Sequence, residues 1–305
     1  MRGSRRSRTG VRTASAVAAV ALCAAGLTTY GVVHDGGGHG SAARSAKPRA
    51  PRPERVWDTS PSSLAAVGDS MTRGFDACSV LTDCPEVSWS TGSDPDVDSL
   101  AVRLLGREGA AKHSWNYART GARMRDVAGQ IEKAAPRSPG LVTVLAGAND
   151  ACRDTVQDMT PVADFRTAFH HALAVAHDRL PKSEVYVASV PDLKRLWSQG
   201  RGNPLGRQVW KLGICPTMLE DSGARDAAAT RRRDAVRERV VAYNSVLREE
   251  CAAVPRCRFD DGAVFEYRFG TGQLSHWDWF HPSRDGQARL AEIAFARVTA
   301  PEAVS

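Results

Sequence analysis

From Ser63 onward, short apolar runs alternate with longer segments whose apolar residues recur at helical spacing. The clearest run is LVTVLA at 141–146, which is too short for a buried helix. Strands alternating with helices are typical of a parallel sheet covered on both faces, so the sequence predicts an α/β fold. The predicted strands are 64–67, 113–118, 141–146, 184–190 and 256–259, and the predicted helices are 97–106, 123–135, 161–180, 226–250 and 283–298.

One segment of the domain predicted at 61–305 departs from this alternation. Residues 191–223 contain Trp197, Trp210 and five glycines, without a strand or helix pattern. Structureless segments of this length inside a compact domain are usually functional or disordered. Because Cys215 would anchor the segment, it is interpreted either as a lid or pocket wall or as a surface excursion.

The N-terminal region has the layout of an export signal. Five arginines between positions 2 and 12 precede an apolar, Ala-rich run that extends weakly to Val33. Residues 1–33 are therefore predicted to be a secretory signal peptide or, if uncleaved, a membrane anchor. Residues 34–60, rich in Gly, Ala, Pro and Arg, are predicted to form a disordered basic linker. We expect a secreted protein, or one tethered to the outer face of the cell membrane.

The net charge of +7 comes from this N-terminal region. Residues 1–56 carry a net charge of +8, and the remainder carries −1. A nearly neutral folded part does not indicate a nucleic-acid partner. The hydrophobic content of 42% and charged content of 25% are ordinary for a soluble domain, which we expect to be a monomer.

Six cysteines follow the linker, and an even number after an export signal indicates disulfides. Sequence alone cannot choose among the 15 pairings that six cysteines allow. We favour sequential pairing, because two pairs lie six residues apart with turn-forming residues between them. The chain has no C-x-x-C pair, so no metal site is predicted. The cysteines are Cys78, Cys84, Cys152, Cys215, Cys251 and Cys257.

Small polar clusters follow the predicted strands where a parallel sheet places its ligands. Ser70 follows the first strand, Gly121 the second and Asn149 the third, while Asp278 and His281 precede the last helix. Each cluster alone is a weak signal, because such short motifs are common in turns and caps. Their order, each after a strand, favours a shared site at one edge of the sheet.

The residue types in this site are suited to acyl transfer. Ser70 is the candidate nucleophile and His281 its general base, with Asp278 three residues earlier to orient the imidazole. The backbone N–H groups of Ser70 and Gly121 and the side-chain amide of Asn149 are candidate donors to an oxyanion. His276 is a competing base, but the Asp-x-x-His spacing favours His281.

These motifs resemble the four marker blocks of the SGNH, or GDSL-type, hydrolases. The blocks correspond to GDSM at 68–71, NYARTG at 116–121, GAND at 147–150 and DWFH at 278–281. The resemblance implies a three-layer α/β/α sandwich with a five-stranded parallel sheet of flavodoxin-like topology. It implies the triad and oxyanion donors named above, with no cofactor. GDSM replaces the commoner GDSL, and the cysteine content is similar to that of actinobacterial extracellular members.

The function expected from these features is hydrolysis of acyl esters by a Ser-His-Asp mechanism, with a small-molecule or lipid ester as substrate. Two alternatives use the same triad, namely a carbohydrate O-acetylesterase and an envelope-tethered O-acyltransferase. Five tryptophans offer apolar and stacking surface to acyl chains or sugars, although each is equally suited to the core. They are Trp89, Trp197, Trp210, Trp277 and Trp279.

Overall fold

The computed structural model describes residues 57–301, so the predicted signal or anchor and most of the predicted linker lie outside the described residues. The end of that linker, however, belongs to the folded domain. Trp57 is only 5% exposed, and its Nε1 donates a hydrogen bond to the carbonyl of Val298 at 2.8 Å. None of the helices within residues 57–301 has both the length and the apolar character needed to cross a bilayer.

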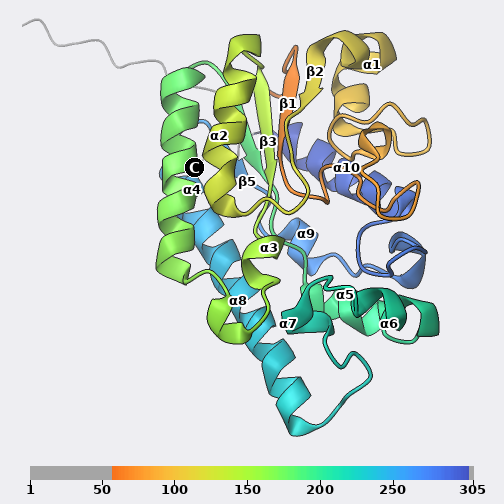
Figure 1. Ribbon diagram of the computed structural model, residues 1–305. Helices are drawn as coiled ribbons and strands as arrows, with labels where there is room; N and C mark the ends of the chain where they lie inside the picture. The colour runs from red at the N-terminus through yellow and green to blue at the C-terminus, as the bar shows by residue number, and fades with distance from the viewer. Residues whose placement is uncertain (1–56, 302–305) are drawn as a thin grey trace, which may run out of the picture. The chain divides into compact units, whose positions relative to one another are not determined.

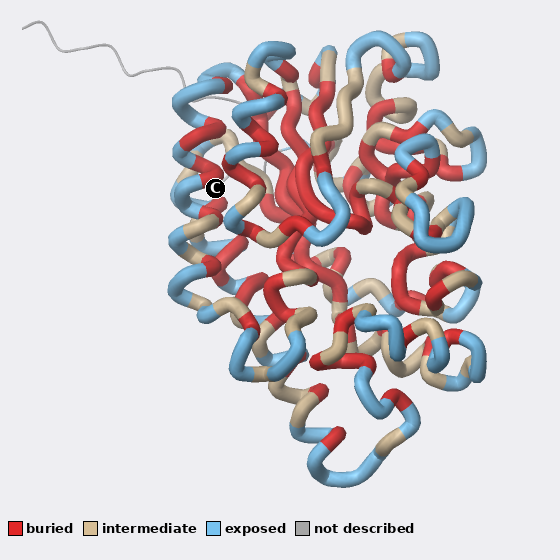
Figure 2. The backbone as a smooth tube through the Cα atoms, in the orientation of Figure 1, coloured by how far each residue is buried: buried red, intermediate tan, exposed pale blue. Residues whose placement is uncertain are grey.

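The core of the domain is a five-stranded parallel sheet in the order β2-β1-β3-β4-β5 (Figure 1). This is the flavodoxin-like strand order, so the predicted fold class is confirmed. The central strands are buried along their whole length, as Figure 2 shows, which explains their continuous apolar runs. The strands are β1 (Leu64–Gly68), β2 (Ser114–Asn116), β3 (Leu141–Leu145), β4 (Glu184–Val187) and β5 (Cys257–Phe259).

Helices cover both faces of the sheet and complete the three layers. Helices α2, α4 and α8 pack together on one face, and α1 and α10 pack together on the other (Figure 1). These helices are α1 (Leu100–His113), α2 (Met124–Ala134), α4 (Val162–Arg179), α8 (Ala227–Ala252) and α10 (Arg284–Val298). Short elements connect them: α3 (Ala148–Ala151), α9 (Ala263–Glu266), and the 3-10 turns η1 (Pro85–Val87), η2 (Ala135–Arg137), η3 (Val156–Asp158) and η4 (Thr271–Gln273).

Helix α1 differs from its predicted bounds. The helix was predicted to end at Gly106, and the backbone does break there, with φ +69° and ψ 166°. A second helical segment then continues to His113, which delays the second strand until Ser114. Glycine tolerates this conformation, so the sequence marked a kink rather than the end of the helix.

The prediction that residues 191–223 lack regular structure is wrong. The segment forms α5 (Leu193–Gly200), α6 (Pro204–Trp210) and α7 (Pro216–Leu219). Asp192 caps α5 and Asn203 caps α6 through their side chains, and a proline begins α6 and α7. These N-cap and N1 signals are present in the sequence, and Leu193, Leu196 and Trp197 have helical spacing in α5, but helices of 4–8 residues give only a short pattern.

The three disulfides pair sequentially, as predicted. Cys78–Cys84 and Cys251–Cys257 each close a short loop, whereas Cys152–Cys215 joins positions 63 residues apart. This third disulfide attaches α7 to the chain directly after α3. It therefore connects residues 191–223 to the carboxyl end of β3.

Arg233 on α8 holds the same segment from the other side. Its side chain is 1% exposed, and its guanidinium lies 4.2 Å from the ring centroid of Trp197. Burial lowers the pKa of Arg233, yet the planar group finds acceptors for its N–H donors. Those acceptors are the carbonyls of Met218, Glu220, Asp221 and Ala224.

Replacing Arg233 by alanine is expected to lower the free energy of unfolding by about 3–5 kcal/mol, because several buried carbonyls lose their donor and Trp197 loses its partner. Urea unfolding followed by tryptophan fluorescence measures this loss. Arg231→Ala is the matched control, since Arg231 is exposed on the same helix and should change stability by less than about 0.5 kcal/mol. Equal losses in the two variants would contradict the role assigned to Arg233.

Candidate active site

The predicted site residues meet at the carboxyl ends of the strands. Ser70 follows β1 and Asn149 follows β3, on the two sides of the point where the strand order reverses. This switch point is where open α/β sheets bind ligands. Gly121 follows β2, and the loop before α10 brings His281 to Ser70 across 211 residues of sequence.

Gly68 makes the turn that presents Ser70. Its φ is +141°, and a Cβ at this position would lie 2.1 Å from the carbonyl oxygen of Leu145. Only glycine permits this close approach between the ends of β1 and β3. The chain then turns at once, with the N–H of Thr72 donating to the carbonyl of Asp69 at 3.1 Å.

Ser70, His281 and Asp278 form one line of hydrogen bonds. Ser70 Oγ lies 3.0 Å from His281 Nε2, and His281 Nδ1 is hydrogen-bonded to Asp278 Oδ2. All three residues are at most 9% exposed. An imidazole held by a carboxylate at Nδ1 presents the Nε2 lone pair to the hydroxyl, so this arrangement can remove the proton from Ser70.

Charge in this group is concentrated on Asp278 and His281. Burial acts to raise the pKa of Asp278, but the charge and hydrogen bond of His281 and two backbone N–H donors outweigh it and lower the pKa. Burial acts to lower the pKa of His281, but the charge and hydrogen bond of Asp278 outweigh it and raise the pKa. The pair therefore favours an ionised carboxylate beside a basic imidazole.

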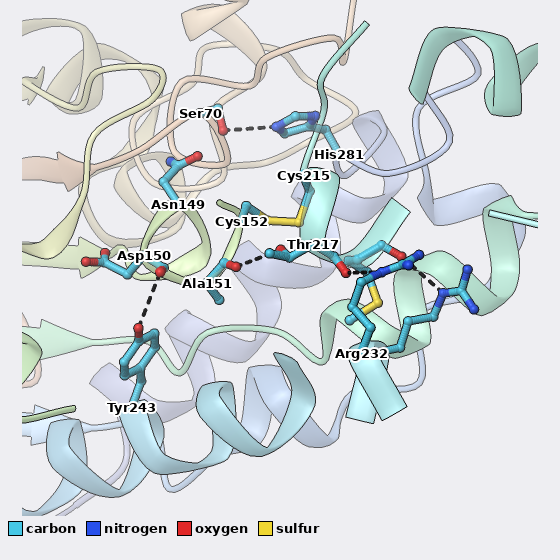
Figure 3. Close-up of a disulfide and its surroundings, with 12 residues drawn as sticks. Ser70, Asn149, Asp150, Ala151, Cys152, Cys215, Thr217, Arg232, Tyr243 and His281 are labelled. Carbon is cyan, nitrogen blue, oxygen red and sulfur yellow. Dashed lines mark hydrogen bonds between the residues drawn. A yellow bond between two sulfur atoms is a disulfide. The ribbon is translucent and has the colours of Figure 1, made fainter. Parts of the chain in front are cut away.

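Three donors remain available for a developing oxyanion. Among the described residues, no hydrogen-bond acceptor is found for the backbone N–H of Ser70 or of Gly121. Asn149 Nδ2 donates one N–H to the carbonyl of Ala122 at 2.9 Å, which leaves its second N–H free. Figure 3 shows the Asn149 side chain pointing toward Ser70. The geometry is suited to stabilising negative charge on a carbonyl oxygen.

The competing base lies elsewhere. His276 is exposed and packs on the ring of Trp277, with ring centroids 4.4 Å apart. Of the tryptophans considered for substrate contact, Trp89 and Trp210 are buried. These two belong to the core rather than to an open substrate surface.

The sequence prediction missed Asp76, which is 1% exposed and lies close to the Asp278–His281 pair. Burial, followed by the charge of Asp278, raises the pKa of Asp76 to about 6. Asp69 is also buried, and its burial raises its pKa to about 7. Asp76 is six residues from Ser70 in a loop without a motif, so only its acidic side chain could have drawn attention to it.

A comparison with protein families agrees with this geometry. The sequence profile of the GDSL-like Lipase/Acylhydrolase family matches residues 64–294. The chain belongs to this family. It is therefore a carboxylic ester hydrolase. No curated protein matches the chain.

Solved structures of GDSL-type and related esterases are similar to this chain at low identity. A candidate GDSL-like lipase from Parabacteroides merdae is 16% identical, with a TM-score of 0.46, over 81% of this chain and 98% of that chain. Phospholipase A1 from Streptomyces albidoflavus is 19% identical, with a TM-score of 0.44 and coverages of 79% and 100%. A family 3 carbohydrate esterase from Clostridium thermocellum is 14% identical, with a TM-score of 0.43 and coverages of 77% and 94%.

Two groups of side chains in this GDSL-family domain bring three metal-ligand atoms within 4.8 Å of one another. In the group that contains His281, both ring nitrogens are already hydrogen-bonded, to Ser70 and to Asp278. In the other group, Cys78 and Cys84 form a disulfide. Neither group therefore offers a free set of ligands. The groups are Asp76, Asp278 and His281, and Cys78, Cys84 and Glu86.

Residues 191–223 pack directly against the loop that carries Asp278 and His281 in this GDSL-family site. Trp210 Nε1 donates to the carbonyl of Asp278 at 2.5 Å. A Cβ on Gly206 would lie 3.0 Å from the ring of Trp279. Trp210 also lines a cavity of about 910 Å³, formed by residues 204–226 and Asp154. The segment thus contacts the candidate site through Trp210 and provides most of the lining of a cavity that includes neither Ser70 nor His281.

Proposed function

We propose that the protein is a serine ester hydrolase in which Ser70 is the nucleophile, His281 the general base and Asp278 the residue that orients the base. The observation that carries this proposal is the line of hydrogen bonds from Ser70 Oγ through His281 to Asp278. His281 takes the proton as Ser70 Oγ bonds to the acyl carbon, then returns it to the leaving alcohol. Water hydrolyses the acyl-enzyme by the same route.

The oxyanion hole in this proposal consists of the N–H groups of Ser70 and Gly121 and the side-chain amide of Asn149. Their free donors support this assignment, because a carbonyl oxygen gains most from donors that need not give up another acceptor.

Covalent labelling tests the proposed nucleophile. An alkyl phosphonate p-nitrophenyl ester should inactivate the enzyme and add one phosphonyl group at Ser70, because the activated hydroxyl displaces nitrophenolate. Peptide mass spectrometry locates the label. A label on another serine, or inactivation without a label, would reassign the nucleophile.

For the substrate, we propose lipid-type acyl esters. Four large apolar side chains are exposed on the two segments beside the 275–281 loop, and they offer a surface for acyl chains. One segment contacts this loop through Asp76, and the other through Gly206. The side chains are Val80, Leu81, Leu205 and Leu212.

A carbohydrate ester is the second candidate, and the charged side chains in the lining of the 910 Å³ cavity favour it. Arg207, Lys211 and Asp221 are among its lining residues, and such groups bind hydroxyls better than acyl chains. A series of p-nitrophenyl esters from acetate to palmitate separates the two. A maximum at long chains supports the lipid assignment, whereas a sharp preference for acetate would replace it with the carbohydrate ester.

We propose that the enzyme acts outside the cytoplasm, either secreted or tethered by its N-terminal segment. The three disulfides support this location, since they are typical of oxidising compartments.

A further inference from the structure

A third carboxyl group lies beside the proposed triad. Asp76, Asp278 and His281 each have an oxygen or nitrogen atom within 4.8 Å of the others. Asp278 is three residues from His281, whereas Asp76 comes from the loop that follows Ser70. The fold thus brings carboxyl groups from two distant segments to one imidazole.

The position of Asp76 is held from several directions. Its Oδ1 accepts a hydrogen bond from the N–H of Leu81, and its own N–H donates to the carbonyl of Thr82 at 3.0 Å. Its carbonyl accepts from Ser275 Oγ at 2.5 Å, which ties it to the loop that carries Asp278. The Cys78–Cys84 disulfide closes the same turn. These hydrogen bonds and the disulfide therefore fix the position of Asp76 beside the 275–281 loop.

The second oxygen of Asp76 has no local partner. Within the described residues, Asp76 Oδ2 is buried and makes no hydrogen bond. A buried carboxylate oxygen without a donor is costly, so its presence beside the proposed triad requires an explanation. The charged groups with the largest effect on the pKa of Asp76 are Asp278, which raises it, and His281, which lowers it.

The proposed reaction creates a positive charge in this place. When His281 Nε2 accepts the proton of Ser70, the imidazole becomes an imidazolium, and nearby negative charge stabilises it. The carboxylates with the largest effect on the pKa of His281 are those of Asp278, Asp76 and Asp69. Asp278 is hydrogen-bonded to the ring, and Asp76 contributes from the opposite loop.

We propose that Asp76 is a positioning residue of this site, whose carboxylate stabilises the imidazolium formed when His281 takes the Ser70 proton. Asp76 gains no proton in this step and acts only through His281. The proposal rests on the proposed roles of Ser70 and His281. Burial and the charge of Asp278 raise the pKa of Asp76 to about 6, so its carboxyl group is ionised at neutral and alkaline pH.

The substitution Asp76→Asn tests this, since asparagine keeps the Oδ1 acceptor for Leu81 and removes the charge. The readout is kcat/KM for a p-nitrophenyl ester between about pH 4 and about pH 9. In this profile kcat/KM falls at low pH, where His281 becomes protonated, and reaches a plateau at higher pH. Without the second carboxylate the pKa of His281 falls, so this acidic limb should move to lower pH by ~0.5–1 unit. The plateau value of kcat/KM should fall ~3–10-fold, because the imidazolium loses a stabilising charge.

Asp83→Asn is the control for disturbance of the loop. Asp83 lies in the same turn and pairs with Arg73 at 3.1 Å, and it is not among the carboxylates with the largest effect on the pKa of His281. In Asp83→Asn the acidic limb should stay at the same pH, even if the plateau value of kcat/KM changes. The proposal would be overturned if Asp76→Asn lowered the plateau without moving the acidic limb. It would also be overturned if Asp83→Asn moved the limb as far as Asp76→Asn does.

Two further measurements keep the test decisive. If Asp76→Asn does not fold, Asp76→Ser also removes the charge and is assayed in the same way, and an acidic limb at the same pH as in the unchanged enzyme would overturn the proposal. Failure of the proposed function would be recognised separately. In that case the phosphonate would label a residue other than Ser70 in the unchanged enzyme.

Discussion

Replacing Ser70 by alanine is expected to lower kcat for p-nitrophenyl esters about a millionfold, to the level that substrate binding and the oxyanion donors sustain alone. Without Oγ no acyl-enzyme forms, and His281 can at most activate a water molecule. The fold should persist, since Ser70 Oγ is hydrogen-bonded only to His281 among the described residues. Turnover is measured together with the thermal unfolding midpoint.

Ser79→Ala is the matched control for this variant. Ser79 is exposed on the loop that follows Ser70, and its substitution should leave both kcat and the unfolding midpoint unchanged. Full activity in Ser70→Ala would remove Ser70 from the mechanism and leave the GDSL-family membership intact, because that membership rests on residues 64–294 as a whole.

Replacing Asn149 by alanine is expected to lower kcat by ~10²–10³ with little change in KM, because the lost amide acts on charge that develops only in the transition state. The same amide also donates to Ala122, next to Gly121, so its loss weakens the support of a second donor. Steady-state kinetics at the pH optimum measures the effect.

Asn203→Ala is the control for loss of an asparagine amide. Asn203 caps α6 by accepting hydrogen bonds from the N–H groups of Leu205 and Gly206. Its substitution should cost about 1 kcal/mol of stability and leave kcat unchanged. A kcat loss in Asn149→Ala no larger than in Asn203→Ala would exclude Asn149 from the oxyanion hole.

The sequence was informative about this site for a physical reason. In a parallel sheet all strands end at the same edge, so residues that follow successive strands are brought together whatever their separation along the chain. This is why Ser70, Gly121 and Asn149 could be assigned to one edge from strand positions alone. The predicted helix at 97–106 was less accurate, because Gly106 produced a kink rather than an end.

The sequence failed where position depends on packing between segments that share no periodic pattern. Nothing in the run from 191 to 223 indicates that Trp210 reaches the carbonyl of Asp278, or that Gly206 makes room for Trp279. These contacts depend on the Cys152–Cys215 disulfide and on Arg233, whose partners are main-chain carbonyls. Carbonyls are present in every residue, so such partners leave no trace in the sequence.

The sequence by itself determined the α/β fold and the order of the polar clusters that follow the strands, and it was the source of the proposed roles of Ser70, Asp278 and His281. Local spacing and strand periodicity suffice for these, because a parallel sheet converts order along the chain into position in space. Only the tertiary structure decided that Asp76 lies beside His281. Its place depends on the Ser275 hydrogen bond between two loops about 200 residues apart, and a long-range contact between irregular loops has no sequence period to reveal it.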